Sequence, residues 1–142
     1  MNRDLIQQLT QLRLSTVITN LTLQEEQPHL YNDLSFHERL SILLAEELTT
    51  REQRKINRLV KQAKLRLAAH PSQIDYRVSR GIEKAKIASL LEGHWLKNHQ
   101  NLIFTGATGC GKTYLGCAIG NYFCQQGIPV RYFRMKGLQE QL

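Results

Sequence analysis

Apolar side chains in the first part of the chain recur with the period of an α-helix. Residues three or four positions apart share one face of a helix. The recurring set consists of Leu5, Ile6, Leu9, Leu12, Val17, Ile18 and Leu21. Pro28 and the polar residues 31–33 then interrupt the pattern. The spacing therefore predicts helices before Pro28 and a break after them.

A long helix is predicted to begin at Ser35. Its hydroxyl can accept a hydrogen bond from the backbone N–H of Glu38, and the Glu38 carboxylate can reach back to the N–H of Ser35, which is a capping box. The apolar face behind this cap consists of Phe36, Leu40, Leu43, Leu44 and Leu48. The helical pattern continues to His70, and Pro71 is predicted to end it.

The second part of the chain changes to a mixed pattern. Residues 72–78 are polar and predict a linker. A further helix is predicted before Gly93 from the spacing of Ile82, Ala85, Ala88, Leu90 and Leu91. Two short apolar runs, "QNLIFT" at 100–105 and "IPVRYF" at 128–133, predict strands, the first of them buried.

A helix is predicted between these two runs. It covers residues 112–126, and Gly127 stands where a helix commonly ends in a left-handed residue. The last seven residues, "KGLQEQL", can begin another helix. The predicted order is therefore helices first, followed by strand, loop, helix and strand, which gives an expected α/β fold class.

The loop after the first predicted strand matches the pattern G-x-x-x-x-G-K-[ST]. The candidate nucleotide-binding residues are Gly106, Ala107, Thr108, Gly109, Cys110, Gly111, Lys112 and Thr113. Glycines allow the backbone N–H groups to converge on one anion at the positive end of the following helix. Lys112 would reach the β- and γ-phosphates, and Thr113 would offer its hydroxyl to Mg²⁺ as the one candidate metal ligand. The alternative is a tight turn with an exposed lysine.

Cysteine spacing favours packing over metal binding. Cys110, Cys117 and Cys124 are seven residues apart, whereas zinc ligands usually come in pairs two to four residues apart. Cys117 and Cys124 share one helix face and are predicted to lie in the core. The chain has no run of eighteen apolar residues and no apolar signal segment, so a cytoplasmic protein with reduced thiols and no membrane partner is expected.

Charge divides unevenly along the chain, whose net charge is +7. Residues 1–50 carry three basic and seven acidic side chains, while residues 51–142 carry sixteen basic and five acidic ones. Residues 51–66 alone hold seven basic residues and one acidic residue. A helical wheel places six of them on one face, and these candidate nucleic-acid contacts are Arg51, Arg54, Lys55, Arg58, Lys61 and Arg66.

This basic face is predicted to contact phosphates of a nucleic acid without reading the bases. The opposite face is apolar, although Leu65 falls among the basic residues. Two alternatives stay open from the residues alone. One is an ordinary solvated helix face, and the other is a membrane surface, for which bulky aromatic residues are missing.

The sequence as a whole resembles the IstB-like helper ATPases of insertion sequences and, more distantly, the DnaC-type helicase loaders. The resemblance rests on the phosphate loop combined with the basic helix and "RGIEKA" at 80–85, and is most specific over residues 34–142. It implies ATP and Mg²⁺ as cofactors, DNA and a transposase as partners, and a homo-oligomer in full-length members. It also implies an AAA+ P-loop domain with a parallel sheet.

The expected organisation is a helical DNA-binding domain at 1–70, a linker and helix at 71–97, and a P-loop ATPase part at 98–142. The ATPase part is expected to be truncated, because no acidic pair follows a later apolar strand and the last acidic residue is Glu140. Hydrolysis of ATP is therefore not expected from these residues, and no catalytic residue is assigned. The leading hypothesis is an ATP-binding helper of transposition. The alternatives are a helicase-loader-like protein and a nucleic-acid-binding module with a vestigial nucleotide site.

Overall fold

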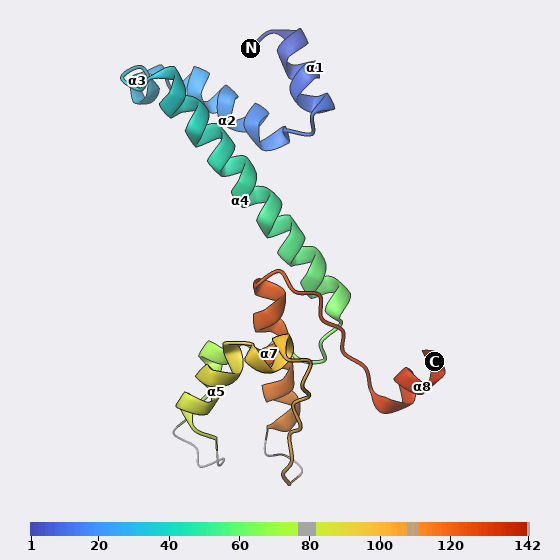
Figure 1. The fold of residues 1–142 in the computed structure, drawn as a ribbon. Helices are drawn as coiled ribbons and strands as arrows, with labels where there is room; N and C mark the ends of the chain where they lie inside the picture. The colour runs from blue at the N-terminus through green and yellow to red at the C-terminus, as the bar shows by residue number, and fades with distance from the viewer. Residues whose placement is uncertain (77–81, 108, 110, 142) are drawn as a thin grey trace. The chain divides into compact units, whose positions relative to one another are not determined.

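The computed structural model describes residues 1–76, 82–107, 109 and 111–141 of the chain. All regular secondary structure in those residues is helical (Figure 1). The elements are α1 (Arg3–Gln11), α2 (Ser15–Glu26), α3 (Pro28–Tyr31), α4 (Phe36–Ala63), the short 3-10 helix η1 (Pro71–Gln73), α5 (Lys84–Leu91), α6 (His94–Lys97), α7 (Lys112–Gln125) and α8 (Met135–Gln141). The chain divides into two compact units, Met1–Lys55 and Ile56–Leu142, so the division falls inside α4.

The capping box at the start of α4 is confirmed. The backbone N–H of Glu38 donates to Ser35 Oγ at 3.2 Å, and the backbone N–H of Ser35 donates to Glu38 Oε2 at 2.7 Å. In the same unit, Gln24 of α2 is buried and exchanges two hydrogen bonds with Arg39 of α4. Polar groups on both helices therefore join α2 to α4.

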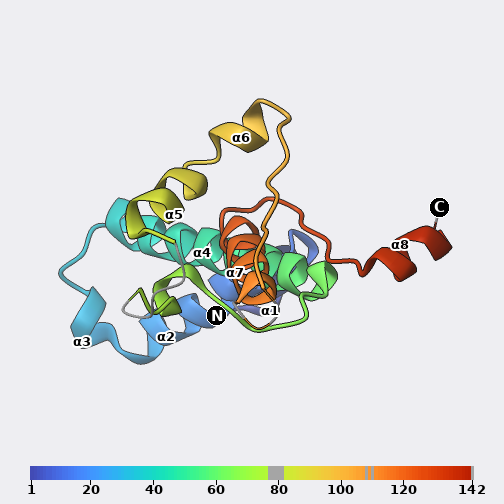
Figure 2. The ribbon, with the colours of Figure 1, turned by 90° about the horizontal axis from the view of Figure 1, so that it is seen from below.

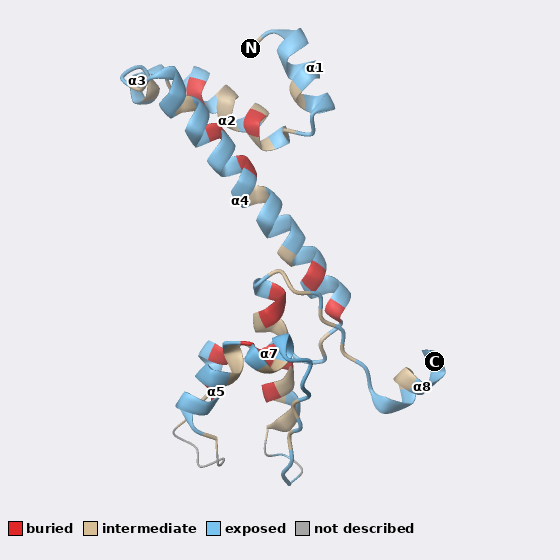
Figure 3. Ribbon diagram, viewed as in Figure 1, coloured by how far each residue is buried: buried red, intermediate tan, exposed pale blue. Residues whose placement is uncertain are grey.

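The predicted apolar face of α4 is wrong for most of its members. Leu43 is buried, whereas Phe36 is 72% exposed and Leu48 is 69% exposed. Leu40 and Leu44 are also exposed, and most of this part of α4 is exposed in Figure 3. The buried side of the helix carries Glu47 beside Leu43, because Glu47 meets hydrogen-bonding groups at the start of α2. The spacing of apolar residues alone does not predict an interface that is built from polar groups.

The second unit has its main core along α7. Leu115, Ile119 and Phe123 lie on one face of that helix and pack against Ile87 of α5. Two further small clusters bury Cys117 and Cys124, as the sequence predicted for both thiols. Burial raises the pKa of the Cys124 thiol. These contacts hold α7 in place and so fix the position of its first turn.

The end of α7 is a Schellman motif around Gly127, whose φ is 81°. The N–H of Gly127 donates to the carbonyl of Cys124, and the N–H of Ile128 donates to the carbonyl of Phe123. Ile128 also packs against the cluster that contains Phe123. The predicted helix end at Gly127 is therefore confirmed.

The basic helix α4 ends at Ala63, and the prediction that it continues to His70 is wrong. Lys64 has a φ of 51°, in the left-handed region that breaks a helix. Because the helix ends here, Leu65 can pack over Gly120 of α7. The packing is close, since a Cβ added to Gly120 would lie 3.2 Å from a methyl group of Leu65. Leu65 interrupted the predicted basic face because it lies after the end of the helix.

Residues 65–73 continue along α7. Leu65 and Ala69 pack against the cluster formed with Cys117 and Ala118. The side chain of Asn121 donates a hydrogen bond of 2.9 Å to the carbonyl of Ala69. Nearer the start of α7, Tyr114 Oη donates to Gln73 Oε1 at 3.4 Å. This segment, called the return segment below, therefore links the end of α4 to the first turn of α7.

The expected α/β fold class with a parallel sheet is wrong for the described residues, which contain no strand. Ile103, in the first predicted strand, is 83% exposed. No backbone hydrogen bond joins the two predicted strands among the described residues; instead the N–H of Tyr132 donates to the carbonyl of Ala63. A strand exists through the ladder that it forms with a neighbour, and a short apolar run cannot supply that neighbour.

Candidate nucleotide and nucleic-acid sites

The predicted phosphate loop lies directly before the first residue of α7. Gly106, Ala107 and Gly109 are exposed, as is Thr113 on the first turn of the helix. Thr108 and Cys110 belong to the predicted set but lie outside the described residues. The sequence motif thus occupies an accessible loop that ends at a helix N-terminus.

Two glycines give this loop its backbone path. Gly109 has a φ of 83° and Gly111 has a φ of 91°, both in the left-handed region that residues with a Cβ rarely adopt. Gly111 is the N-cap of α7, and its carbonyl accepts the N–H of Leu115 at 2.9 Å. The pattern's requirement for glycine at position 111 therefore has a direct conformational reason.

The first turn of α7 presents donors to the loop. Among the described residues, no hydrogen-bond acceptor is recorded for the backbone N–H groups of Lys112, Thr113 and Tyr114. These are the groups that an α-helix leaves unsatisfied at its start, where its dipole is positive. The side chain of Lys112 folds back across the loop, and its Nζ donates to the carbonyl of Gly106. The ammonium group of Lys112 and the N-terminus of α7 therefore adjoin the same short loop.

A hollow of about 290 Å³ adjoins Lys112. Its walls come from α5, from residues 102–105 and from the first turn of α7. Lys86 lines it together with Lys112, and none of its lining residues is acidic. Lys86 was not among the predicted site residues, because helical spacing places it on α5 without indicating which part of the chain α5 meets. Two cations on one hollow favour an anionic ligand.

The predicted basic set on α4 is not a uniform surface. Arg54, Lys55, Arg58 and Lys61 are exposed on the helix, and none of them takes part in an ion pair recorded within the described chain. Arg66 lies beyond the end of α4, so the structure does not place it on the predicted helix face. Of the six predicted residues, these four exposed ones can contact a polyanion from α4, and they are called the basic face below.

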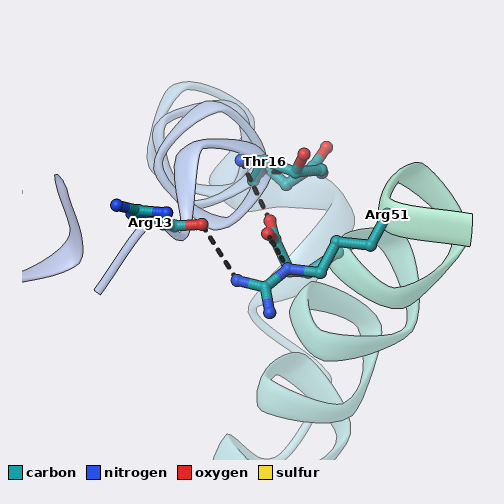
Figure 4. Close-up of polar contacts among 5 residues, drawn as sticks. Arg13, Thr16 and Arg51 are labelled. Carbon is teal, nitrogen blue, oxygen red and sulfur yellow. Dashed lines mark hydrogen bonds and ion pairs between the residues drawn. The ribbon is translucent and has the colours of Figure 1, made fainter. Parts of the chain in front are cut away.

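Arg51 has a structural role instead. Its Nε donates to Glu47 Oε1 at 2.9 Å, and its Nη2 donates to the carbonyl of Arg13 at 2.9 Å (Figure 4). The N–H of Thr16 donates to the other Glu47 oxygen at 3.1 Å. Burial alone would raise the pKa of Glu47, but the hydrogen bond and charge of Arg51, with hydrogen bonds from the side chain of Thr16 and the backbone of Val17, lower it. This guanidinium therefore holds the corner between α1 and α2.

Other kinds of site are not supported by the described residues. They contain no group of three or more His, Cys, Asp or Glu side chains placed to hold a metal ion. Thr113, the predicted Mg²⁺ ligand, is an exposed residue of the first turn of α7. None of the helices in the described chain combines the length and the apolar character needed to cross a membrane.

Comparison with known proteins gives consistent matches. Residues 7–142 match the family described as IstB-like ATP binding protein. A Pseudomonas fluorescens protein, named as an ATP-binding protein of insertion sequence IS1162, is 41% identical over 143 residues that cover 100% of this chain and 62% of the relative. Two Sinorhizobium fredii proteins, also named as insertion-sequence ATP-binding proteins, are similar over less of their length. One is 39% identical over 74% of this chain and 43% of the relative, and the other is 32% identical over 98% of this chain and 54% of the relative. The chain therefore spans about half the length of these relatives.

Proposed function

The chain belongs to the family of IstB-like ATP-binding proteins of insertion sequences, and from this premise we propose that it binds ATP and DNA as a helper of transposition. The observation that carries the nucleotide part is the loop before α7. Its left-handed glycines and Lys112 lie at the N-terminus of α7, where a helix presents N–H groups that have no partner within the helix. That combination suits a polyphosphate.

In this proposal the triphosphate lies against residues 106–113. The N–H groups of the first turn of α7 hold the phosphate oxygens, and Lys112 leaves the carbonyl of Gly106 to bind the phosphates. The hydroxyl of Thr113, an exposed residue, would be a ligand for Mg²⁺, which would offset part of the phosphate charge. We propose binding of ATP alone, without hydrolysis.

The DNA part of the proposal rests on the basic face of α4. Four exposed cations on one side of a helix repel one another unless an anion lies against them, and a phosphate backbone is such an anion. The names of the relatives connect them with insertion sequences. We therefore propose the transposase of such an element as the protein partner. A pull-down of this chain with the purified transposase, and separately with a purified replicative helicase, tests which of the two proteins it binds.

Lys112→Ala tests the nucleotide site. The change removes a charged hydrogen-bond donor to phosphate, so ATP affinity should fall by roughly tenfold to a hundredfold. Lys97→Ala removes an exposed cation of α6 and is the matched control, with unchanged affinity expected. Titration calorimetry with ATP and Mg²⁺ measures both. Equal affinity of wild type and Lys112→Ala would remove the phosphate-loop assignment.

A second candidate is favoured by the basic face alone. In this second candidate function, the chain is a nucleic-acid-binding module with a vestigial nucleotide site, and nucleotide binding does not affect DNA binding. This reading expects the same DNA affinity with and without ATP. An ATP-dependent increase of severalfold that Lys112→Ala abolishes would exclude the second candidate and support the first.

A further inference from the structure

Residues 131–136 form a second basic segment, distinct from α4. The segment reads "RYFRMK", and Arg131, Arg134 and Lys136 are all exposed. No Asp or Glu occurs between Glu92 and Glu140, so the chain offers no neighbouring carboxylate within this stretch. Phe133 lies among these cations and is 37% exposed. An exposed aromatic ring between arginines is an arrangement that single-stranded nucleic acids bind.

The segment is fixed beside the C-terminal end of α4. The N–H of Tyr132 donates to the carbonyl of Ala63 at 2.8 Å, which satisfies one of the carbonyls that a helix leaves free at its end. Val130, two residues earlier, packs against Leu59, Ala63 and Cys124. Figures 1 and 2 both show the chain after α7 passing the end of α4 before it reaches α8. Two basic stretches of the second unit therefore adjoin.

Exposure alternates along this segment. Val130 and Tyr132 are half-buried, whereas Arg131 and Phe133 are exposed. The guanidinium carbon of Arg131 lies 5.4 Å from the centroid of the Phe133 ring. A cation at this distance from a ring is attracted to its face and limits the orientations of both side chains. The alternation thus leaves one arginine and one aromatic ring together on the outer side.

We propose that Arg131, Phe133 and Arg134 bind an unpaired stretch of DNA, with the arginines on its phosphates and one base stacked on the Phe133 ring. Arg58 and Lys61, in the last two turns of α4, and the following Lys64 extend the same surface. This inference rests on the proposed function, since it assumes that DNA is the polyanion on α4. It adds a preference for unpaired DNA, because a base inside a duplex stacks on its neighbours and cannot reach the ring.

Two variants test the segment: one is compared on two forms of DNA, and the other is compared with a control variant. Phe133→Leu keeps an apolar side chain and removes the stacking surface, so affinity for a labelled 20-nucleotide oligothymidylate should fall at least fivefold while affinity for a 20-base-pair duplex stays within twofold. The double variant Arg131→Gln, Arg134→Gln should reduce the slope of log K against log salt on the oligothymidylate by about 1.4. Lys84→Gln with Lys97→Gln removes two exposed cations elsewhere and should leave that slope unchanged.

The results separate this inference from the proposed function. Equal effects of Phe133→Leu on the two DNA forms, or a salt slope for the double arginine variant equal to that of its control, would overturn the inference. If Arg54→Gln, Arg58→Gln and Lys61→Gln still weaken duplex binding in that case, the proposed DNA role stands. If these changes have no effect either, the DNA role fails too. Tighter binding to phosphatidylserine vesicles than to oligothymidylate would also overturn the inference, in favour of a membrane surface.

Discussion

Asn121, in the middle of α7, donates its side-chain N–H to the carbonyl oxygen of Ala69, 52 residues earlier in the chain, at 2.9 Å. Ala69 is 1% exposed, so water has little access to this carbonyl. The bond therefore joins the return segment to the helix that carries Lys112.

Asn121→Ala should destabilise the second unit. Removing the donor leaves the buried carbonyl of Ala69 without its partner, which costs about 1–3 kcal/mol. Urea unfolding followed by circular dichroism measures the loss. Asn98→Ala, at an exposed position after α6, is the control and should change the free energy of unfolding by less than about 0.5 kcal/mol. Equal effects of both changes would mean that the Asn121 bond contributes nothing.

Glu47→Gln should remove a pH-dependent part of the stability of the first unit. The folded pKa of Glu47 lies below its ordinary value of 4.5, so the stabilisation is complete above that value and is lost as pH falls through the folded pKa. At neutral pH the variant should be less stable by about 1–3 kcal/mol, because hydrogen bonds to a charged group are lost.

The free energy of unfolding of wild type and of Glu47→Gln should be measured at several pH values, and the difference between the two taken at each. That difference should shrink as pH falls from neutral to below 4.5. Glu46→Gln changes the neighbouring, exposed carboxylate and should give a small difference at every pH. A constant difference for Glu47→Gln would show that the carboxylate's charge is not what stabilises the corner between α1 and α2.

Gly111→Ala and Gly116→Ala should have opposite consequences, although both are one-methyl changes near the start of α7. At Gly111 the φ of 91° strains any residue with a Cβ, by roughly 1–2 kcal/mol, and ATP affinity should fall with the distorted loop. At Gly116 a Cβ meets nothing within 4 Å, so alanine should stabilise the helix by about 0.5–1 kcal/mol. Thermal unfolding and ATP titration measure the pair; a loss of ATP affinity in Gly116→Ala would contradict it.

Neutralising the basic face should weaken DNA binding in a salt-dependent way. The triple variant Arg54→Gln, Arg58→Gln, Lys61→Gln removes three of the proposed phosphate contacts, and the slope of log K against log salt on duplex DNA should fall by about 2.7. Arg3→Gln, Lys84→Gln and Lys97→Gln together remove the same charge from other exposed positions. An identical slope for the two triple variants would indicate a general charge effect and no particular role for α4.

Local signals in the sequence predicted the ends of several helices correctly. The Ser35 cap and the Gly127 end depend on residues within a few positions of each other, so the sequence contains all that is needed. The prediction of strands was wrong because a strand needs a partner strand from elsewhere in the chain, which local sequence does not indicate. The apolar face with Phe36 and Leu48 failed because the buried side of α4 is partly polar, around Glu47.

The candidate site shows the same division. The motif at residues 106–113 was found because its spacing is local, and the helix that follows begins where the motif requires. The structural role of Arg51 was missed, since its second bond reaches the carbonyl of Arg13, 38 residues away. Lys86 was missed because only the fold brings α5 to the hollow beside Lys112.

The left-handed turn at Lys64 has a mechanical consequence. After it, Leu65 packs beside Gly120, the carbonyl of Ala69 accepts a hydrogen bond from Asn121, and the side chain of Gln73 accepts one from Tyr114. Residues 65–73 therefore hold both the middle and the first turn of α7. Any ligand that displaces the first turn of α7 must either carry this stretch along or break its hold, and the last turn of the cationic helix is attached to the other end.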